Sequence, residues 1–149
     1  MRLNTRSFGE LDVEVKHQIH FEQGLLGFSN EKDFVLLRNY DTEDPVPFMW
    51  LQSINDPEIA FVLTIPSLVY GEYDFDLNDD LVKMLHVNNP EDVAVFNVVK
   101  IPDTVDNMTV NLKSPIIINV QNREGCQITL ENDNYTINYK PNNNNGQNN

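Results

Sequence analysis

Short runs in which every second residue is apolar recur along almost the whole chain. The clearest comes first, because Leu11, Val13 and Val15 alternate with acidic residues, which directs one face inward and the other to water. Later runs are separated by segments rich in proline, glycine, asparagine and aspartate, which favour turns. The runs cover residues 19–21, 34–40, 48–54, 58–66, 92–102, 108–114, 116–121, 126–131 and 134–140. This pattern predicts a mainly all-β protein.

One segment alone has helical character, residues 76–87, in which Leu81, Met84 and Leu85 fall on one face. Asp76 or Asn78 is placed to cap its first turn. About eight or nine short strands with one short helix are typical of a small antiparallel β-barrel-like domain. We expect the helix to lie across an open end of the sheet.

The alternation also predicts which side chains point inward. The expected inward residues are all apolar, namely Phe61, Leu63, Ile65, Ile116, Ile118 and Val120. Val62 lies on the opposite face of its strand and is apolar too, which indicates that part of the sheet is covered on both sides. Turns or bulges are expected at Gly24 and Gly27. Asn122 and Gly125 fit a type I turn between two antiparallel strands, with Gly125 at positive φ.

The length of 149 residues suits one domain, which would bury roughly 70% of the surface of the unfolded chain. We expect residues 1–140 to form it and residues 141–149, PNNNNGQNN, to be a disordered asparagine-rich tail. No apolar run approaches the ~18 residues that a membrane-spanning helix requires. The single cysteine, Cys126, excludes an internal disulfide. A cytoplasmic protein is therefore expected.

The chain is strongly acidic, with 23 aspartates and glutamates against 10 lysines and arginines and a formal net charge of -13. Such a surface repels nucleic acid and anionic lipids and attracts basic partners. We therefore expect no direct binding to nucleic acid or membranes. The same charge is compatible with a role in solubility alone.

The sequence contains no recognisable catalytic or metal-binding arrangement. His17 and His20 would face opposite sides of a strand, so they cannot share a metal ion. His86 lies near the end of the predicted helix, where the macrodipole favours a cation. Cys126 has Arg123 nearby, which would lower its pKa slightly, but no histidine is close in sequence to act as a base. We expect no enzymatic activity, no cofactor and no metal ion.

The densest polar cluster is GEYDFDLNDD, residues 71–80, which has five carboxylates and no basic residue. It is similar to the start of a calcium loop, but the sixth position is Asp79 rather than glycine and the twelfth is Leu85 rather than glutamate. A weaker, irregular calcium site stays open. Aromatic residues interleave with the carboxylates, which suits an interface with a basic partner. The alternative is a solvated helix N-terminus.

Five stretches of the chain resemble the flagellar assembly factor FliW family. They are IHFEQGLLGF, PFMWLQSINDPEIAFVLTIP, YDFDLNDD, DVAVFNVVKIP and NLKSPIIINVQNREGCQITL. They follow the family's order and run through almost the whole chain, apart from the tail. The last stretch is the most specific, because its Asn-Leu, Pro-Ile and Ile-Asn pairs recur with a hairpin of this length.

The resemblance implies a bacterial cytoplasmic protein with a small β-barrel-like fold that is not an enzyme. Family members bind CsrA, a small dimeric RNA-binding repressor of flagellin translation, and they also bind flagellin. Flagellin occupies the protein until it is secreted, and the released protein then captures CsrA and relieves repression. The resemblance implies contact with a C-terminal extension of CsrA beside its RNA surface. Charge alone is equally compatible with an acidic decoy that covers that surface.

We place the partner contact on the acidic and aromatic stretch and on a strand end where a proline leaves the edge open. The predicted partner-binding residues are Tyr70, Glu72, Tyr73, Asp74, Phe75, Asp76, Ile101, Pro102 and Asp103. We expect a monomer when no partner is bound. Two alternatives are a small β-barrel that binds a small molecule, which should show polar inward residues, and a chaperone that binds flagellin alone.

Overall fold

The computed structural model describes residues 1–6, 8–14, 17–38 and 48–141. Its strands are β1 (Arg2–Thr5), β2 (Gly9–Asp12), β3 (Gln18–Phe21), β4 (Asp33–Arg38), β5 (Phe48–Ser53), β6 (Ala60–Thr64), β7 (Val93–Lys100), β8 (Thr109–Val110), β9 (Ile116–Asn119) and β10 (Glu124–Gln127). The α-helix is α1 (Asp79–Met84), and the short 3-10 helices are η2 (Pro66–Leu68), η3 (Pro90–Asp92) and η4 (Val105–Asn107). No helix in these ranges is long and apolar enough to cross a membrane.

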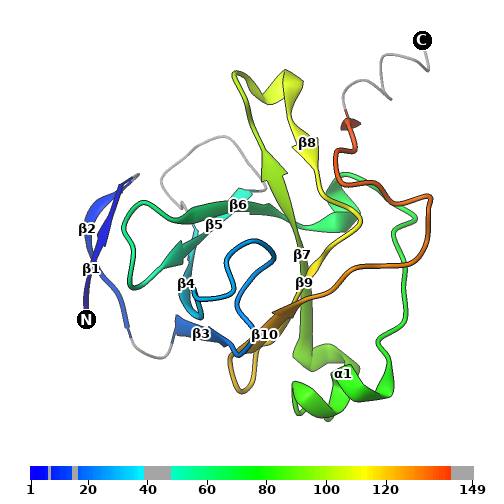
Figure 1. The fold of residues 1–149 in the computed structure, drawn as a ribbon, viewed down its shortest axis with the longest axis horizontal. Helices are drawn as coiled ribbons and strands as arrows, with labels where there is room; N and C mark the ends of the chain where they lie inside the picture. The colour runs from blue at the N-terminus through cyan, green and yellow to red at the C-terminus, as the bar shows by residue number, and fades with distance from the viewer. Residues whose placement is uncertain (7, 15–16, 39–47, 142–149) are drawn as a thin grey trace.

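Seven of the strands close into a barrel (Figure 1). Their order is β6-β5-β4-β3-β10-β9-β7, and β7 pairs with β6 to complete the circle. The neighbouring pairs are antiparallel except for β10 and β3, which are parallel. β8 pairs with β7 outside this circle of seven strands, and β1 and β2 form a separate hairpin. The predicted β-barrel-like fold with one short helix is confirmed.

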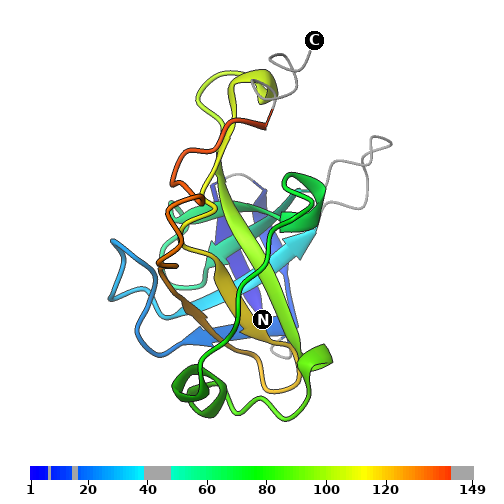
Figure 2. The same ribbon diagram turned by 90° about the vertical axis from the view of Figure 1, so that its right-hand side faces the viewer.

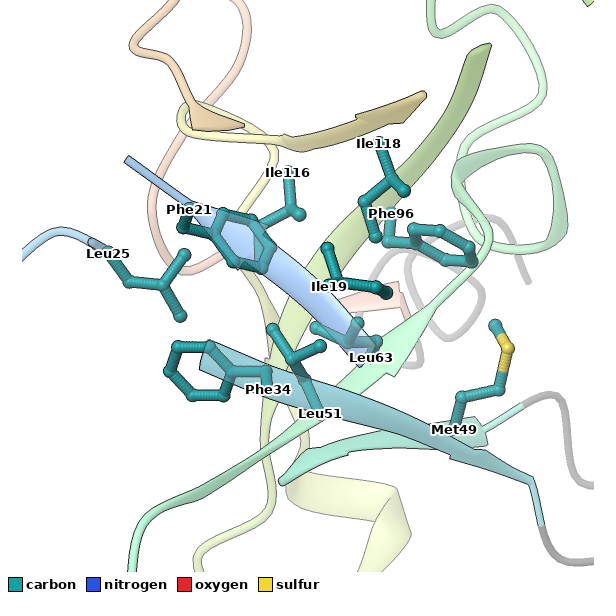
Figure 3. Packing of buried hydrophobic residues seen from close by; sticks show 10 residues of the cluster. All are labelled: Ile19, Phe21, Leu25, Phe34, Met49, Leu51, Leu63, Phe96, Ile116 and Ile118. Carbon is teal, nitrogen blue, oxygen red and sulfur yellow. The ribbon is translucent and has the colours of Figure 1, made fainter. Parts of the chain in front are cut away.

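Side chains that point into the barrel form the main core (Figure 3). The buried members are Ile19, Phe21, Leu25, Phe34, Met49, Leu51, Leu63, Phe96, Ile116 and Ile118. Leu25 comes from the loop between β3 and β4, which lies in front of the barrel in Figure 1. This loop therefore closes one end of the barrel. In Figure 3, Phe96, Ile118 and Met49 lie on the side of the cluster away from Leu25, and Ile19 lies between the two sides.

Two of the predicted inward residues are wrong. Ile65 is 40% exposed and Val120 is 50% exposed, whereas Leu63, Ile116 and Ile118 are almost fully buried. The reason is local, because Ile65 and Val120 each follow the last residue of a strand, where the alternation of faces stops. Phe61 is half-buried against the core, as predicted.

Apolar side chains on the outer face of the barrel are covered by two further clusters. The outer tyrosine cluster has Val99, Met108, Val110, Leu112 and Tyr135 as its buried members, and Val62 packs against it. This packing confirms that part of the sheet is covered on both sides. The helix cluster consists of Leu81, Leu85, Ile117 and Cys126.

Helix α1 begins where the sequence predicts, but its position on the barrel differs from the prediction. The Asn78 side chain caps it by accepting a hydrogen bond of 2.8 Å from the Leu81 N–H. The helix packs against the outward side chains of β9 and β10, so the expectation that it lies across an open end of the sheet is wrong. Leu85 is buried there, but Met84 is 39% exposed. The apolar side chains of α1 thereby cover Ile117 and Cys126, which point outward from the barrel.

The hairpin of β9 and β10 forms with shorter strands than predicted. Its left-handed residue is Arg123, with φ of 61°, rather than Gly125. Gly125 is required for another reason, since a Cβ atom there would lie 2.6 Å from Cε2 of the buried Phe21 ring. The predicted turns at Gly24 and Gly27 are confirmed, as both have positive φ.

Both ends of the chain differ from expectation. β1, which the alternation did not reveal, pairs with β2, and β2 ends at Asp12 instead of continuing toward β3. The predicted strand at 134–140 is wrong, because Tyr139 makes only an isolated bridge with Val110. Tyr135 is 6% exposed but Ile137 is 67% exposed, although a strand would place both on one face. The predicted tail, except for Pro141, lies outside the described residues, as do residues 39 and 40.

Candidate partner-binding surface

Residues 70–78 form a segment, here called the acidic strap, that crosses the outer face of β7 between η2 and α1 (Figure 2). Exposure alternates along it from residue 72 to residue 78. The half-buried side chains are Tyr73, Phe75 and Leu77, and the exposed carboxylates are Glu72, Asp74 and Asp76. One face of the strap is therefore packed on the barrel, and the opposite face presents negative charge to solvent.

The aromatic rings of the strap pack within the protein. Tyr70 contacts Tyr73, Tyr135 and Tyr139 edge-on, with ring centroids 5.3 to 6.4 Å apart. Tyr73 also contacts Phe75, with centroids 5.6 Å apart. Edge-to-face aromatic pairs add about 0.5–1.5 kcal/mol each beyond the area that they bury. These rings hold the strap in place, so the surface available to a partner consists mainly of carboxylates.

Two tyrosine hydroxyls fix the backbone of the strap. The Tyr73 hydroxyl donates a hydrogen bond of 2.6 Å to the Leu112 carbonyl and accepts one of 3.4 Å from Asn97 Nδ2. Burial raises the pKa of Tyr73 to about 12, so this hydroxyl stays protonated. The Tyr135 hydroxyl accepts a bond of 2.9 Å from the Asp74 N–H and donates one of 3.0 Å to the Asp74 carbonyl.

The second predicted segment follows β7 on the arm that projects with β8 (Figures 1 and 2). Ile101 is half-buried, whereas Pro102 and Asp103 are exposed. Hydrogen bonds from Asn107 Nδ2 and from the Thr104 N–H lower the pKa of Asp103. The carboxylate therefore remains charged while it fixes the turn after the strand.

The structure brings part of the two predicted segments together. Tyr70, Tyr73 and Ile101 all pack against the outer tyrosine cluster. Phe75 packs against the helix cluster instead. The exposed carboxylates of the strap thus lie over a rigid layer that is shared with the strand end. That a partner binds there stays a prediction.

Sequence reasoning missed the residues that anchor the strap. Tyr135 and Tyr139 were assigned to a strand, and Asn97, which is fully buried beneath the strap, received no role. Asn97 Nδ2 donates to the Asn111 carbonyl at 2.9 Å as well as to Tyr73. The sequence did contain a signal, because Tyr135 and Tyr139 are large aromatic residues in a segment rich in asparagine, and such rings are expected to pack on an apolar surface.

The single cysteine lies in the helix cluster and is 7% exposed. Burial raises the pKa of the Cys126 thiol to about 11. The prediction that Arg123 lowers this pKa is therefore wrong, because the penalty for burying a thiolate dominates. A thiol held protonated is a poor nucleophile at neutral pH.

Two histidines pair with carboxylates. His20 Nδ1 lies 2.8 Å from Asp33 Oδ1 and its Nε2 lies 2.9 Å from Glu22 Oε2. These bonds, chiefly the one to Asp33, raise the pKa of His20. His86 Nδ1 lies 3.0 Å from Glu124 Oε2. The described residues contain no group of three or more histidine, cysteine or acidic side chains arranged to hold a metal ion.

Comparisons with known proteins match almost the whole chain to one family. A family model described as FliW protein matches residues 2–141. The flagellar assembly factor FliW of Caldicellulosiruptor saccharolyticus is 44% identical over 137 residues, which cover 92% of this chain and 88% of that protein. The corresponding factor of Geobacillus thermodenitrificans is 39% identical over 140 residues, 94% of each chain.

A solved structure shows the same relationship in three dimensions. The crystal structure of a flagellar assembly factor FliW superposes with a TM-score of 0.86 and 36% sequence identity. The superposition covers 94% of this chain and 96% of that chain. The chain therefore belongs to the FliW family of flagellar assembly factors.

Proposed function

We propose that this protein is a cytoplasmic regulator without enzymatic activity that binds two proteins in exchange, the translational repressor CsrA and flagellin. The observation that carries the proposal is the family match over residues 2–141, supported by the superposed FliW structure. When flagellin is secreted, the released protein captures CsrA and relieves the repression of flagellin translation.

The acidic strap is the proposed contact for CsrA. The stretch 71–80 has five carboxylates and no basic residue, on a chain with a net charge of -13. A repressor that binds RNA carries a basic surface, and complementary charge accelerates encounter and excludes wrong partners. The hydrogen bonds of Tyr73 and Tyr135 fix the strap before binding. Less conformational entropy is therefore lost when the complex forms.

We further propose that the protein binds CsrA beside its RNA surface and opposes RNA without covering that surface. The exposed carboxylates of the strap, Glu72, Asp74 and Asp76, recur at every second residue along one segment and so form a row. A row of this kind suits a single extended segment of a partner better than a whole RNA-binding surface. Pro102 and Asp103 extend the proposed contact.

The test is a binding assay on the immobilised protein with purified CsrA and purified flagellin, first separately and then together. We expect each to bind alone and expect excess flagellin to displace CsrA. Binding of flagellin without CsrA would show a chaperone for flagellin alone. Binding of neither would refute the proposal.

The position of the CsrA contact is tested by adding this protein to a preformed complex of CsrA with labelled RNA. If contact lies beside the RNA surface, the RNA dissociation rate from CsrA increases as this protein is added. A decoy that covers the RNA surface leaves that rate unchanged, because it acts only on free CsrA.

A further inference from the structure

The end of the barrel opposite Leu25 contains a hollow of about 460 Å³ that opens to solvent. Its floor includes Ile19, Phe96 and Ile118, which are at most 6% exposed and lie together in Figure 3. Val120, half-exposed just beyond β9, lines it as well. The hollow therefore reaches down to the buried core of the barrel at this end.

The lining of the hollow differs in charge from the rest of the protein. Its described lining residues are apolar apart from His17 and Arg123, and none of them is acidic. This is unusual on a chain with 23 acidic and 10 basic residues. The hollow thus combines an apolar interior with basic side chains, whereas the acidic strap offers carboxylates.

The backbone at Arg123 is fixed in the hairpin turn. Its N–H donates a hydrogen bond of 2.8 Å to the Asn119 carbonyl, and its carbonyl accepts one of 3.0 Å from the His20 N–H. The residue has φ of 61°, a left-handed conformation that is uncommon for arginine. The point from which its side chain leaves the backbone is therefore set by β3 and β9.

The size of the hollow suits a small amphiphile. Binding pockets of roughly 300–1,000 Å³ with apolar walls and a few polar groups are common at the mouths of β-barrels. An engineered apolar cavity of about 150 Å³ accepts benzene, so a hollow three times larger has room for an alkyl chain of roughly eight to fourteen carbons. An extended peptide would need a free strand edge, which the closed barrel does not offer at this end.

We propose that this hollow binds a lipophilic monocarboxylate, with its alkyl chain against Ile19, Phe96 and Ile118 and its carboxylate beside Arg123. Charge complementarity selects the anion, because no described lining residue is acidic. The apolar floor favours a ligand that carries an alkyl chain. This activity is independent of the acidic strap.

The experiment is a calorimetric titration of the full chain with octanoate, decanoate and dodecanoate below their micelle concentrations. We expect saturable binding at one site, with affinity increasing about fourfold for each added methylene group. Dodecanol, which lacks the charge, should bind about tenfold more weakly than dodecanoate. Absence of saturable binding would overturn the proposal.

Three variants, each first shown by thermal unfolding to be folded, locate the site. Val120→Trp fills the mouth and should reduce dodecanoate affinity at least about tenfold. Arg123→Asn, which tolerates the left-handed conformation, should weaken dodecanoate but leave dodecanol unchanged. Ile137→Trp replaces another exposed aliphatic residue, outside the hollow, and should change neither. Unchanged dodecanoate affinity in Val120→Trp would overturn the proposal. The proposal is also overturned if the wild type does not bind dodecanoate and Val120→Trp loses its binding to CsrA or flagellin.

Discussion

Replacing Tyr73 with phenylalanine removes one hydroxyl from beneath the acidic strap and leaves the ring in place. That hydroxyl donates to the Leu112 carbonyl at 2.6 Å and accepts from Asn97 Nδ2 at 3.4 Å. Leu112 and Asn97 are both fully buried. The variant therefore leaves the buried Leu112 carbonyl without the hydrogen bond that Tyr73 donates, whereas Asn97 Nδ2 keeps its bond to the Asn111 carbonyl.

The size of the effect follows from those contacts. A buried polar group left unsatisfied costs about 1–3 kcal/mol. Asn97 Oδ1 already has no hydrogen-bond partner among the described residues, so the site has little capacity to compensate. We expect a loss of about 2 kcal/mol in the free energy of unfolding. For a chain of this size, that corresponds to a decrease of about 4–8 °C in the melting temperature.

The matched control is Tyr70→Phe. Tyr70 belongs to the same aromatic group, but its hydroxyl makes no hydrogen bond to another described residue. Urea unfolding of both variants, followed by circular dichroism, gives the comparison. Equal stability of the two variants, within about 0.3 kcal/mol, would refute the role assigned to the Tyr73 hydroxyl.

The same variant has a signature in alkaline solution. Because burial raises the pKa of Tyr73 from 10.0 to about 12, the folded state holds this proton more tightly than the unfolded state. Its contribution to stability is complete below pH 10 and is lost as the pH rises toward 12. The stability difference between wild type and Tyr73→Phe should therefore narrow over that interval. A constant difference would contradict the assignment.

Three further changes test other parts of the fold. Gly125→Ala places a Cβ atom 2.6 Å from Cε2 of Phe21, so urea unfolding should show a loss of about 1–3 kcal/mol; unchanged stability would contradict the contact. Gln52→Glu replaces an amide whose two Nε2 hydrogens share four backbone carbonyls at 3.1 to 3.4 Å, and it should lower the free energy of unfolding by about 3 kcal/mol or more; an unfolding midpoint equal to that of the wild type would count against this. His20 has a raised pKa, chiefly through Asp33, so its contribution to stability is present below about pH 6.5 and is lost as the pH rises through the raised pKa. In His20→Gln, the decline in melting temperature over that interval should be smaller than in the wild type, and an identical pH profile would exclude this role.

Much of the fold follows from local patterns in the sequence. Alternation identified the barrel strands, and the Asn78 cap marked the start of the helix. What alternation does not determine is where a strand stops, as Ile65 and Val120 show. Nor does it determine which strands pair across long separations, and the parallel pair of β3 and β10 is a case of this kind.

The candidate surface shows the same limit. The sequence shows that aromatic and acidic residues alternate in the strap, which implies two faces. It does not show which face is buried, because the covering side chain of Tyr135 lies 61 positions from Asp74 in the chain. The prediction that exposed aromatics anchor a partner is therefore replaced by one in which the aromatics hold the strap and the carboxylates make the contact.

The most direct test of the central claim is the affinity for CsrA of Glu72→Lys combined with Asp74→Lys. The control is Glu10→Lys with Asp12→Lys, the same charge change on the β1–β2 hairpin on the other side of the molecule (Figure 1). We predict at least about tenfold weaker binding for the strap variant, which is about 1.4 kcal/mol, and a change below about twofold for the control. Equal affinity of the folded strap variant and the wild type would contradict the account.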